Sequence, residues 1–494
     1  MTPPIPFDNS YASLPERFYA RLRPVPVRAP ATIRVNGPLA DYLGIDRAAL
    51  EGDDGAALTT GNRLPEGAEP IAMAYAGHQF GQFNPQLGDG RAILLGEVVA
   101  RDGVRHDLHL KGSGITPYSR GGDGRSPLGP VLREYIVSEA MHALGIPTTR
   151  SLMAATTGER VLRETPLPGA VLLRVARSHI RVGTFELFAS RGDVEGLRIL
   201  LDHALARHYP EHVDAPVPAI AFLRAVGERQ AALIARWQLL GFIHGVMNTD
   251  NMLVCGDTID YGPCAFLDAY DPAKVFSSID QFGRYAYRNQ APIARWNLAA
   301  LARALIALFG EDEPAIERTA EQAQAIIDAF PEQHAQAHRK GLRHKLGLST
   351  DEDGDEALAS ELLQHMHERG ADFTLTFRHL TDLATETPAQ HAVSALLAVP
   401  PTDAWLERWR ARLARDPRHP TERADDMRAV NPALIPRNHR IEAAIRAAED
   451  QGDLAPFHQL VDALEDPSRY DPSRASFARP PRPEERVART FCGT

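Results

Sequence analysis

The clearest pattern in the chain is an apolar stripe at helical spacing over residues 130–144. Its members are Leu132, Tyr135, Ile136, Ala140, Ala143 and Leu144. This spacing predicts a helix that ends at Gly145 and Pro147. The same periodicity predicts helices over the segments 184–190, 219–244, 293–308, 314–330, 356–368 and 404–414.

Shorter apolar runs in the first half of the chain have the composition of strands. Residues 92–99 and 107–111 are typical of a hairpin, because Asp102 and Gly103 supply a turn between them. Further strands are predicted over 151–156, 160–163 and 170–177. Strand-rich sequence followed by helix-rich sequence indicates an α+β fold.

The chain divides into five predicted parts. Residues 1–66 are rich in Pro and polar breaks, so we expect an irregular wrapping segment with one small helix near 39–43. The parts that follow are a strand-rich lobe over 67–185, a helical lobe over 186–345, a C-terminal helical extension over 346–465 and a tail over 466–494. The tail is rich in Pro and Arg and is expected to be poorly ordered.

Charge and cysteine content narrow the class of protein. The 494 residues include 54 Lys and Arg against 64 Asp and Glu, and a net charge of −10 argues against general attraction to nucleic acid. The cysteines, Cys255, Cys264 and Cys492, form no CxxC pair, which suits a reducing compartment. No signal peptide and no apolar run of membrane-spanning length is evident, so we expect a cytoplasmic protein without a membrane partner.

Oxygen-bearing side chains gather in the segment GFIHGVMNTDNMLVCGDTIDYGPCAFLD, residues 241–268. Asp250 and Asn251 are adjacent in a polar turn, and Asp260 follows a short apolar run and a Gly-Asp turn. If these donors meet at the ends of neighbouring strands, they suit Mg²⁺, which needs one or two carboxylates besides substrate phosphates. Asp260 also begins an Asp-Tyr-Gly triplet that resembles the metal-binding Asp-x-Gly of protein kinases. The segment alone fits a polar hairpin turn equally well.

Two features upstream suit an anion such as phosphate. Gly88 and Gly90 flank Asp89 in a turn at which backbone NH groups can approach phosphate oxygens closely. Lys111 lies at the end of the second strand of the hairpin and can act as a point charge. Each has an alternative explanation, since the turn can simply lead into a strand and the lysine can extend along the surface.

Arginines accompany these features. The loop 112–127 has five glycines and carries Arg120 and Arg125, which makes it suitable for an anion, although mobile surface loops have the same composition. Closely spaced arginines follow at Arg174, Arg177 and Arg181. They could clamp a triphosphate through bidentate contacts, or they could simply be exposed.

The predicted helix over 130–144 offers two partners for Lys111. Either Glu134 or Glu139 could form an ion pair that orients the lysine towards phosphates. Helical periodicity places Glu139 on the apolar stripe and Glu134 on its flank, which slightly favours Glu139. Both could also be solvated, as most helical glutamates are.

Long strings in the chain carry a family resemblance. They are FDNSYASLPERFY, AGHQFGQFNPQLGDGRA, LKGSGITPYSRGGDGRSPLGPVLREYIVSEAMHALGIPTTRSL and HGVMNTDNM, together with a cysteine near the C-terminus. On these strings the chain resembles the selenoprotein O, or YdiU, family of kinase-like protein nucleotidyltransferases. The resemblance implies a protein-kinase-like core, with a β-rich nucleotide lobe and a helical lobe, plus an N-terminal wrapping segment and C-terminal helices.

The resemblance also implies an activity. In the family the nucleotide is held flipped relative to ordinary kinases, so that AMP from ATP passes to Ser, Thr or Tyr hydroxyls of proteins. Transfer of UMP from UTP with Mn²⁺ is a variant within the same class. The implied partners are therefore a nucleotide, Mg²⁺ or Mn²⁺, and protein substrates.

Roles follow by position in the shared motifs. The residues implied to bind nucleotide are Gly88, Gly90, Arg91, Lys111, Asp123, Gly124, Arg174, Arg181 and Asp260. Glu134 becomes the partner of Lys111, against the slight preference of periodicity. Asp250 would be the general base, and Asn251 and Asp260 the metal ligands.

Two departures from related patterns bear on these roles. Cys492 stands where some family members carry selenocysteine, so a redox role there would rest on a less acidic thiol, and its disulfide partner is left open. The adjacency of Asp250 and Asn251 differs from the wider spacing in the kinase motif HRD-x-x-x-x-N. An ordinary kinase that transfers the γ-phosphoryl group and a nucleotide-binding pseudokinase scaffold are the competing hypotheses.

Overall fold

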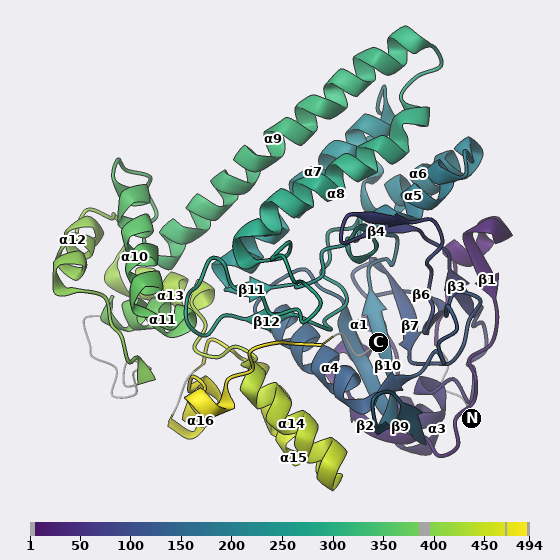
Figure 1. Ribbon diagram of the computed structural model, residues 1–494, viewed down its shortest axis with the longest axis horizontal. Coiled ribbons are helices and arrows are strands. Elements are labelled where there is room, and N and C mark those ends of the chain that lie inside the picture. Colours follow the sequence, from purple (N-terminus) through teal and green to yellow (C-terminus); the bar gives the residue numbers. More distant parts are fainter. Residues whose placement is uncertain (1–4, 385–395, 470–471, 492–494) are drawn as a thin grey trace.

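The computed structural model describes residues 5–384, 396–469 and 472–491. Strands occupy one side of the molecule (Figure 1). Three long helices, α7 (Pro218–Leu239), α8 (Gln290–Leu305) and α9 (Glu313–Lys345), cross above the strands. The α+β class expected from the sequence is confirmed.

The main sheet has eight strands and contains the predicted hairpin. Seven strands follow the order β1-β3-β6-β7-β10-β9-β2 with antiparallel neighbours, and β8 pairs with β10. Their bounds are β1 Tyr19–Arg21, β2 Ala31–Val35, β3 Ile71–Met73, β6 Ala92–Val99, β7 Arg105–Lys111, β8 Ser126–Pro127, β9 Arg150–Leu162 and β10 Pro166–Ala176. Lys111 lies opposite Ala92 on one side and Leu172 on the other, which places it in the middle of the sheet.

The strands after the hairpin are longer than predicted. Segments 151–156 and 160–163 belong to the single strand β9, and β10 begins at Pro166, before the predicted start at 170. Their pairing continues to Leu162 opposite Pro166. Because this end of the hairpin is polar, its apolar alternation is weak and only the long-range pairing defines the strands.

The N-terminal segment is more regular than predicted. It supplies the two edge strands, β1 and β2, and helices α1 (Gly37–Leu43), α2 (Arg47–Leu50) and α3 (Gly52–Thr59). Helix α1 is the small helix expected near 39–43, and the side chain of Asn36 caps it by accepting the N–H of Leu39 at 3.1 Å. Edge strands this short depend on their neighbour for stability, so the local sequence does not reveal them.

Three helices follow strands of the sheet along the chain: α4 (Leu128–Ala143), α5 (Val182–Ser190) and α6 (Val194–His208). Helix α5 packs against α6 and α8, whereas α4 lies against the sheet. Helix α4, predicted over 130–144, packs on β9 and β10 with one side. Its other side contacts α14 (Asn438–Gln451) and α15 (Ala455–Leu464), which lie along it in Figure 1. The sheet and these late helices therefore hold α4 between them.

The ends of α7 and α9 differ from the prediction. Helix α7 stops at Leu239 rather than at 244, because Gly241 takes a left-handed conformation with φ 73°. The next residues form the strand β11 (Phe242–Ile243), which pairs with β12 (Ala265–Phe266). Helix α9 passes the predicted end at 330 and continues through Pro331, because packing against α7 along its length outweighs the hydrogen bond that proline removes.

One helical stretch, Tyr287–Leu308, is long and apolar enough to cross a membrane by length and composition, contrary to the expectation from the sequence. However, 50% of it is buried inside the protein. Helix α8, which forms most of the stretch, packs against α5, α7 and α9. These contacts are those of a core helix, so the stretch carries no argument for a membrane partner.

The C-terminal helices form a second apolar core around Trp405 and Trp409. The helices are α10 (Asp355–Arg369), α11 (Phe373–Leu383), α12 (Asp403–Leu413) and α13 (Pro420–Val430), whereas α16 (Ala475–Ala478) contributes Ala478 to the main core. Those predicted over 356–368 and 404–414 correspond to α10 and α12. Short 3₁₀ turns are η1 Tyr11–Ser13, η2 Glu16–Phe18, η3 Pro210–His212, η4 Thr249–Asn251, η5 Tyr287–Asn289, η6 Ile306–Leu308, η8 Pro472–Arg474 and η9 Pro483–Glu485.

Within the described residues 472–491, the tail is held by specific contacts, although its composition suggested a poorly ordered segment. Thr490 is buried, and its N–H donates to the carbonyl of Phe276 at 2.8 Å. Its hydroxyl donates to the carbonyl of Pro263 at 2.5 Å. Tertiary hydrogen bonds thus order a stretch that has few apolar residues of its own. Cys492, the redox candidate, lies outside the described residues.

Candidate active site

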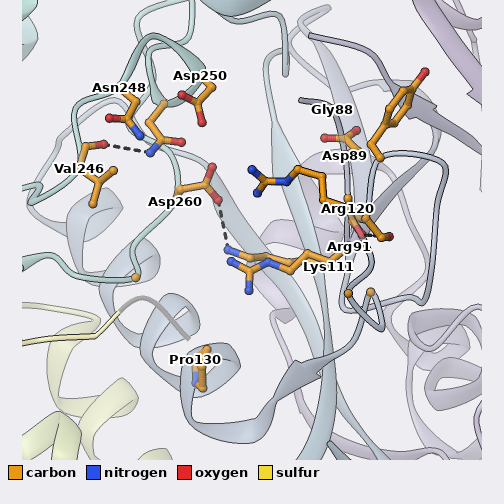
Figure 2. Close-up of a pocket in the computed structure, with 18 of the residues that line it drawn as sticks. Gly88, Asp89, Arg91, Lys111, Arg120, Pro130, Val246, Asn248, Asp250 and Asp260 are labelled. Carbon is orange, nitrogen blue, oxygen red and sulfur yellow. Dashed lines mark hydrogen bonds and ion pairs between the residues drawn. The ribbon is translucent and has the colours of Figure 1, made fainter. Parts of the chain in front are cut away.

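A cavity of about 410 Å³ opens between the sheet and the segment that follows β11. Figure 2 shows Asn248, Asp250 and Asp260 on one side of it and Gly88 and Arg91 on the other. Every residue to which the sequence assigned a nucleotide, metal or base role lines this cavity, as does Glu134. Residues 162 positions apart in the chain, from Gly88 to Asp250, therefore meet at one place.

The sequence suggested that the acidic residues of the segment 241–268 lie at strand ends. The structure does not place them there. Asp250 belongs to the 3₁₀ turn η4, and the stretch between it and Asp260 makes only isolated bridges, Arg181 with Leu253 and Thr148 with Thr258. Asp260 itself has φ 64°. The apolar run 252–254 is instead buried core of irregular backbone, held by hydrogen bonds to residues 180–182.

Lys111 is paired with Glu134 rather than with Glu139. Its Nζ lies 2.5 Å from Oε2 of Glu134 and 3.1 Å from Oδ1 of Asp260. Glu139 instead accepts hydrogen bonds from Arg150 at 2.7 and 2.9 Å. Because α4 lies across β10, the flank of its apolar stripe faces Lys111, and the family resemblance was right where periodicity was wrong.

The carboxylate of Asp260 forms ion pairs with three cationic side chains. Nη2 of Arg174 lies 2.6 Å from its Oδ1, and Nη1 of Arg181 lies 3.1 Å from its Oδ2, in addition to Lys111. Burial opposes ionisation, but Arg174, Lys111 and Arg181 together hold the pKa of Asp260 well below its ordinary value. The carboxylate therefore stays charged, and the cations around it form a site for an anion.

The glycine turn is shaped by close packing against Tyr118. A Cβ at Gly88 would lie 2.4 Å from Cγ of Tyr118, and one at Gly90 would lie 2.6 Å from its carbonyl oxygen. Gly88 also has φ 128°, a conformation that favours glycine. The hydroxyl of Thr116 donates to the carbonyl of Asp89 at 2.7 Å, so the loop 112–127 is fixed onto the turn.

Within the loop 112–127, Asp123 and Gly124 make different contacts. The Asp123 carboxylate accepts hydrogen bonds from Arg163 at 2.9 and 3.2 Å and from the N–H of Arg125 at 2.9 Å. The carbonyl of Gly124 accepts the N–H of Gly114 at 3.0 Å. A Cβ at Gly124 would lie 2.0 Å from the carbonyl oxygen of Gly114. These contacts close the loop over the cavity.

Asp250 differs from Asp260 in its surroundings. It is buried, its Oδ2 accepts the side-chain amide of Gln79 at 3.2 Å, and its Oδ1 has no hydrogen-bond partner among the described residues. Burial raises the pKa of Asp250 to about 6, against the opposing effects of Arg181 and Gln79. A carboxylate of this kind can take a proton near neutral pH.

Asn251 has an oxygen to offer a metal. Its amide nitrogen donates to the carbonyl of Val246 at 2.9 Å, which leaves the amide oxygen for another contact. Among the described residues no group of three or more His, Cys, Asp or Glu could hold a metal. One amide and one carboxylate suit Mg²⁺ or Mn²⁺, which can take their other oxygens from phosphates and water.

Backbone strain concentrates at this cavity. Among the described residues, the non-glycine positions with positive φ are Phe80 at 53°, Arg120 at 51° and Asp260 at 64°. All three line the cavity. Each such conformation costs about 1–3 kcal/mol, and these costs are typical of functional sites.

Sequence reasoning missed the hairpin of β4 (Gly77–Gln79) and β5 (Gln82–Asn84), which contacts the turn η4 that carries Asp250. Besides Gln79, it carries His78, whose N–H donates to the hydroxyl of Thr249 at 2.7 Å. The missed Tyr75 lies just before it, under the guanidinium of Arg181 at 4.6 Å. The string AGHQFGQFNPQLGDGRA contained the hairpin, but nothing in its spacing pointed to residues 248–250.

The two glutamates of α4 allow a direct test. Glu134→Gln removes the charge that orients Lys111 and Arg174, so we expect the KM for ATP to rise or kcat to fall by about tenfold or more. Glu139→Gln weakens the bonds that Glu139 accepts from Arg150, Asn36 and Ser151, and it removes no contact with Lys111. It should therefore lower the free energy of unfolding by about 1–3 kcal/mol and leave both constants unchanged. Steady-state kinetics and thermal unfolding of both variants would measure this. Equal kinetic effects of the two would contradict the assignment.

An anion site built on a lysine–glutamate pair, beside one aspartate that is kept ionised and one whose pKa is raised to about 6, is typical of a nucleotide-dependent transferase. Comparison with known proteins identifies the family of transferases to which the chain belongs. Residues 4–465 match the family described as protein adenylyltransferase SelO. The chain is 59% identical over 494 residues, with 100% of both chains covered, to the protein nucleotidyltransferase YdiU of Bradyrhizobium diazoefficiens.

Two other relatives are also YdiU protein nucleotidyltransferases. The YdiU protein nucleotidyltransferase of a second Bradyrhizobium strain is 60% identical over 495 residues, and that of Methylorubrum populi is 59% identical over 501 residues, again with 100% of each chain covered. The chain therefore belongs to the SelO family of protein adenylyltransferases. Its activity is protein nucleotidyl transfer, with ATP as co-substrate.

Proposed function

We propose that the protein attaches AMP to Ser, Thr or Tyr hydroxyls of its protein substrates, with Asp250 as the base and Asn251 and Asp260 as metal ligands. The observation that carries this assignment is the contrast between the two aspartates. Asp260 is kept ionised by three cations, whereas Asp250 is buried with a pKa of about 6 and an unbonded oxygen. The first suits phosphate and metal binding, and the second suits proton transfer.

The order of the parts supports a protein-kinase-like core. A strand lysine, a helix glutamate that pairs with it, a turn with the base, and an Asp-x-Gly follow one another along the chain, at Lys111, Glu134, Asp250 and Asp260. In protein kinases the corresponding lysine and glutamate position the phosphates. The resemblance adds that the nucleotide is flipped, so that the α-phosphorus faces the acceptor.

In this mechanism the chain's own groups do the following. Lys111, Arg174 and Arg181 bind phosphate oxygens, and the turn at Gly88 lets the backbone come close to them. Asp250 accepts the proton of the acceptor hydroxyl, whose oxygen forms a bond to the α-phosphorus while the bond to the β-phosphate breaks and pyrophosphate leaves. Mg²⁺ or Mn²⁺ held by Asn251 and Asp260 would offset the negative charge on the phosphates.

Label transfer tests the proposal. The purified protein is incubated with a protein substrate mixture and with ATP labelled at either the α- or the γ-phosphate. We expect label on protein only from the α position. Label from the γ position would make the protein an ordinary kinase, and ATP binding without any transfer would make it a pseudokinase scaffold. Parallel reactions with α-labelled UTP and Mn²⁺ decide between AMP and UMP.

A further inference from the structure

Two turns beside Asp250 expose large apolar side chains. Phe282 is 96% exposed and Ile279 is 55% exposed, both in the segment after β12, and Phe83 of β5 is 41% exposed. No other large hydrophobic side chain in the described part of the chain is as exposed as Phe282. Ile279 also lines the cavity that contains Asp250. The two turns that carry these side chains thus also contribute to the lining of the cavity, through Ile279 and Phe80.

The turn that carries Phe282 is firmly held. The buried carboxylate of Asp280 accepts the N–H of Arg284 at 2.9 Å and that of Tyr285 at 2.8 Å. The guanidinium of Arg284 lies over the ring of Trp296, with Cζ 5.0 Å from the ring centroid. Gly283 supplies the left-handed residue that the turn requires, with φ 69°. The exposure of Phe282 is therefore imposed by a turn that is anchored on both sides.

Both apolar turns are hydrogen-bonded to the same side chain, that of Asn248. The hydroxyl of Tyr285 donates to Oδ1 of Asn248 at 2.6 Å, and the N–H of Phe80 donates to the same oxygen at 3.1 Å. The rings of Phe80 and Tyr285 are 5.0 Å apart. Since Asn248 is two residues before Asp250, the hairpin β4–β5 and the turn 279–285 have fixed positions relative to the base.

We propose that the hairpin β4–β5 and the turn 279–285 form the docking surface for the substrate protein, and that they bind a large apolar side chain close to the acceptor hydroxyl. This inference rests on the proposed function, because the hydroxyl must come within hydrogen-bond reach of Asp250. The polypeptide that carries it then passes the cavity that Ile279 lines, beside the turns on which Phe282 and Phe83 are exposed. Exposed large apolar side chains on turns fixed beside a site that receives a protein are typical of a recognition surface.

Short synthetic peptides test this surface on the full-length protein. Each peptide contains a single serine among polar residues, and leucine replaces glutamine at one flanking position at a time. We expect the wild type to transfer α-label best to peptides with leucine at one particular flanking position, by about tenfold over the all-polar peptide. In Phe282→Ser this preference should be lost through a higher KM for the peptide, with kcat and the KM for ATP unchanged.

Matched variants control for general effects. Ile306→Ser alters a side chain that is 43% exposed in η6, outside the proposed surface, and should keep the leucine preference. Phe282→Leu keeps an apolar side chain at this position, so this variant should retain the preference for peptides with leucine. The docking surface is overturned if the wild type labels all peptides equally, or if Phe282→Ser affects transfer no more than Ile306→Ser. No α-label on any peptide would overturn the proposed function together with it.

Discussion

Replacing Asp260 by Ala is expected to reduce AMP transfer at least about a hundredfold, because one charged group that positions the phosphates and holds the metal is removed. ATP binding should survive. The substitution leaves Lys111, Arg174 and Arg181 without the carboxylate that they share in the free protein, so their charge becomes available to the nucleotide. In the presence of a chelator, calorimetry should show that the variant binds ATP as tightly as the wild type or more tightly.

The control for this experiment is Asp260→Asn, which keeps the size of the side chain but not its charge. It should also lose transfer, which separates the effect of charge from that of an unfilled space. Thermal unfolding with and without ATP checks that both variants are folded. Transfer by Asp260→Ala within about threefold of the wild type would contradict a role in phosphate and metal binding, since even one lost transition-state contact usually costs more.

Asp250→Asn is expected to lower kcat by about a hundredfold to ten-thousandfold, the usual contribution of a general base. The wild type should also show a pH dependence that the variant lacks. Burial raises the pKa of Asp250 to about 6, so transfer should be half-maximal near that pH, fall as the carboxyl is protonated below it, and reach a plateau above it. Measuring kcat against pH for both proteins tests this. A wild-type profile that is flat through this range would contradict the assignment.

Gln79 provides an independent check of the same assignment. Its amide donates to the ionised form of Asp250, and this bond lowers the pKa of the carboxyl. Gln79→Leu removes a bond that favours the charged form, so the acidic limb of the profile should move to higher pH while the plateau is retained. A merely structural role for Gln79 would lower activity equally at every pH.

Sequence reasoning went furthest where the signal is local. The stripe over 130–144 predicted α4 to within about two residues, and the apolar runs on either side of the turn at Asp102 and Gly103 predicted the hairpin that carries Lys111. Motif strings predicted which residue types would carry the chemistry. These patterns depend on neighbours within one helix turn or one hairpin, so the sequence alone contains them.

Tertiary packing decided what those residues contact. The choice between Glu134 and Glu139 depends on how α4 lies across β10, and periodicity points to the wrong one. The order of the tail depends on hydrogen bonds between Thr490 and the segments around Pro263 and Phe276, which no local composition reveals.

Tertiary packing also explains why the pKa values of Asp250 and Asp260 differ. By sequence alone, Asp250 and Asp260 are two similar aspartates in one polar segment. Their different pKa values arise because β7 and β10 bring Lys111 and Arg174 to Asp260, whereas the hairpin β4–β5 buries Asp250. The sequence by itself therefore determined the family and the set of chemical groups, while the tertiary structure determined which carboxylate stays charged and which can take a proton, because a pKa depends on neighbours in space.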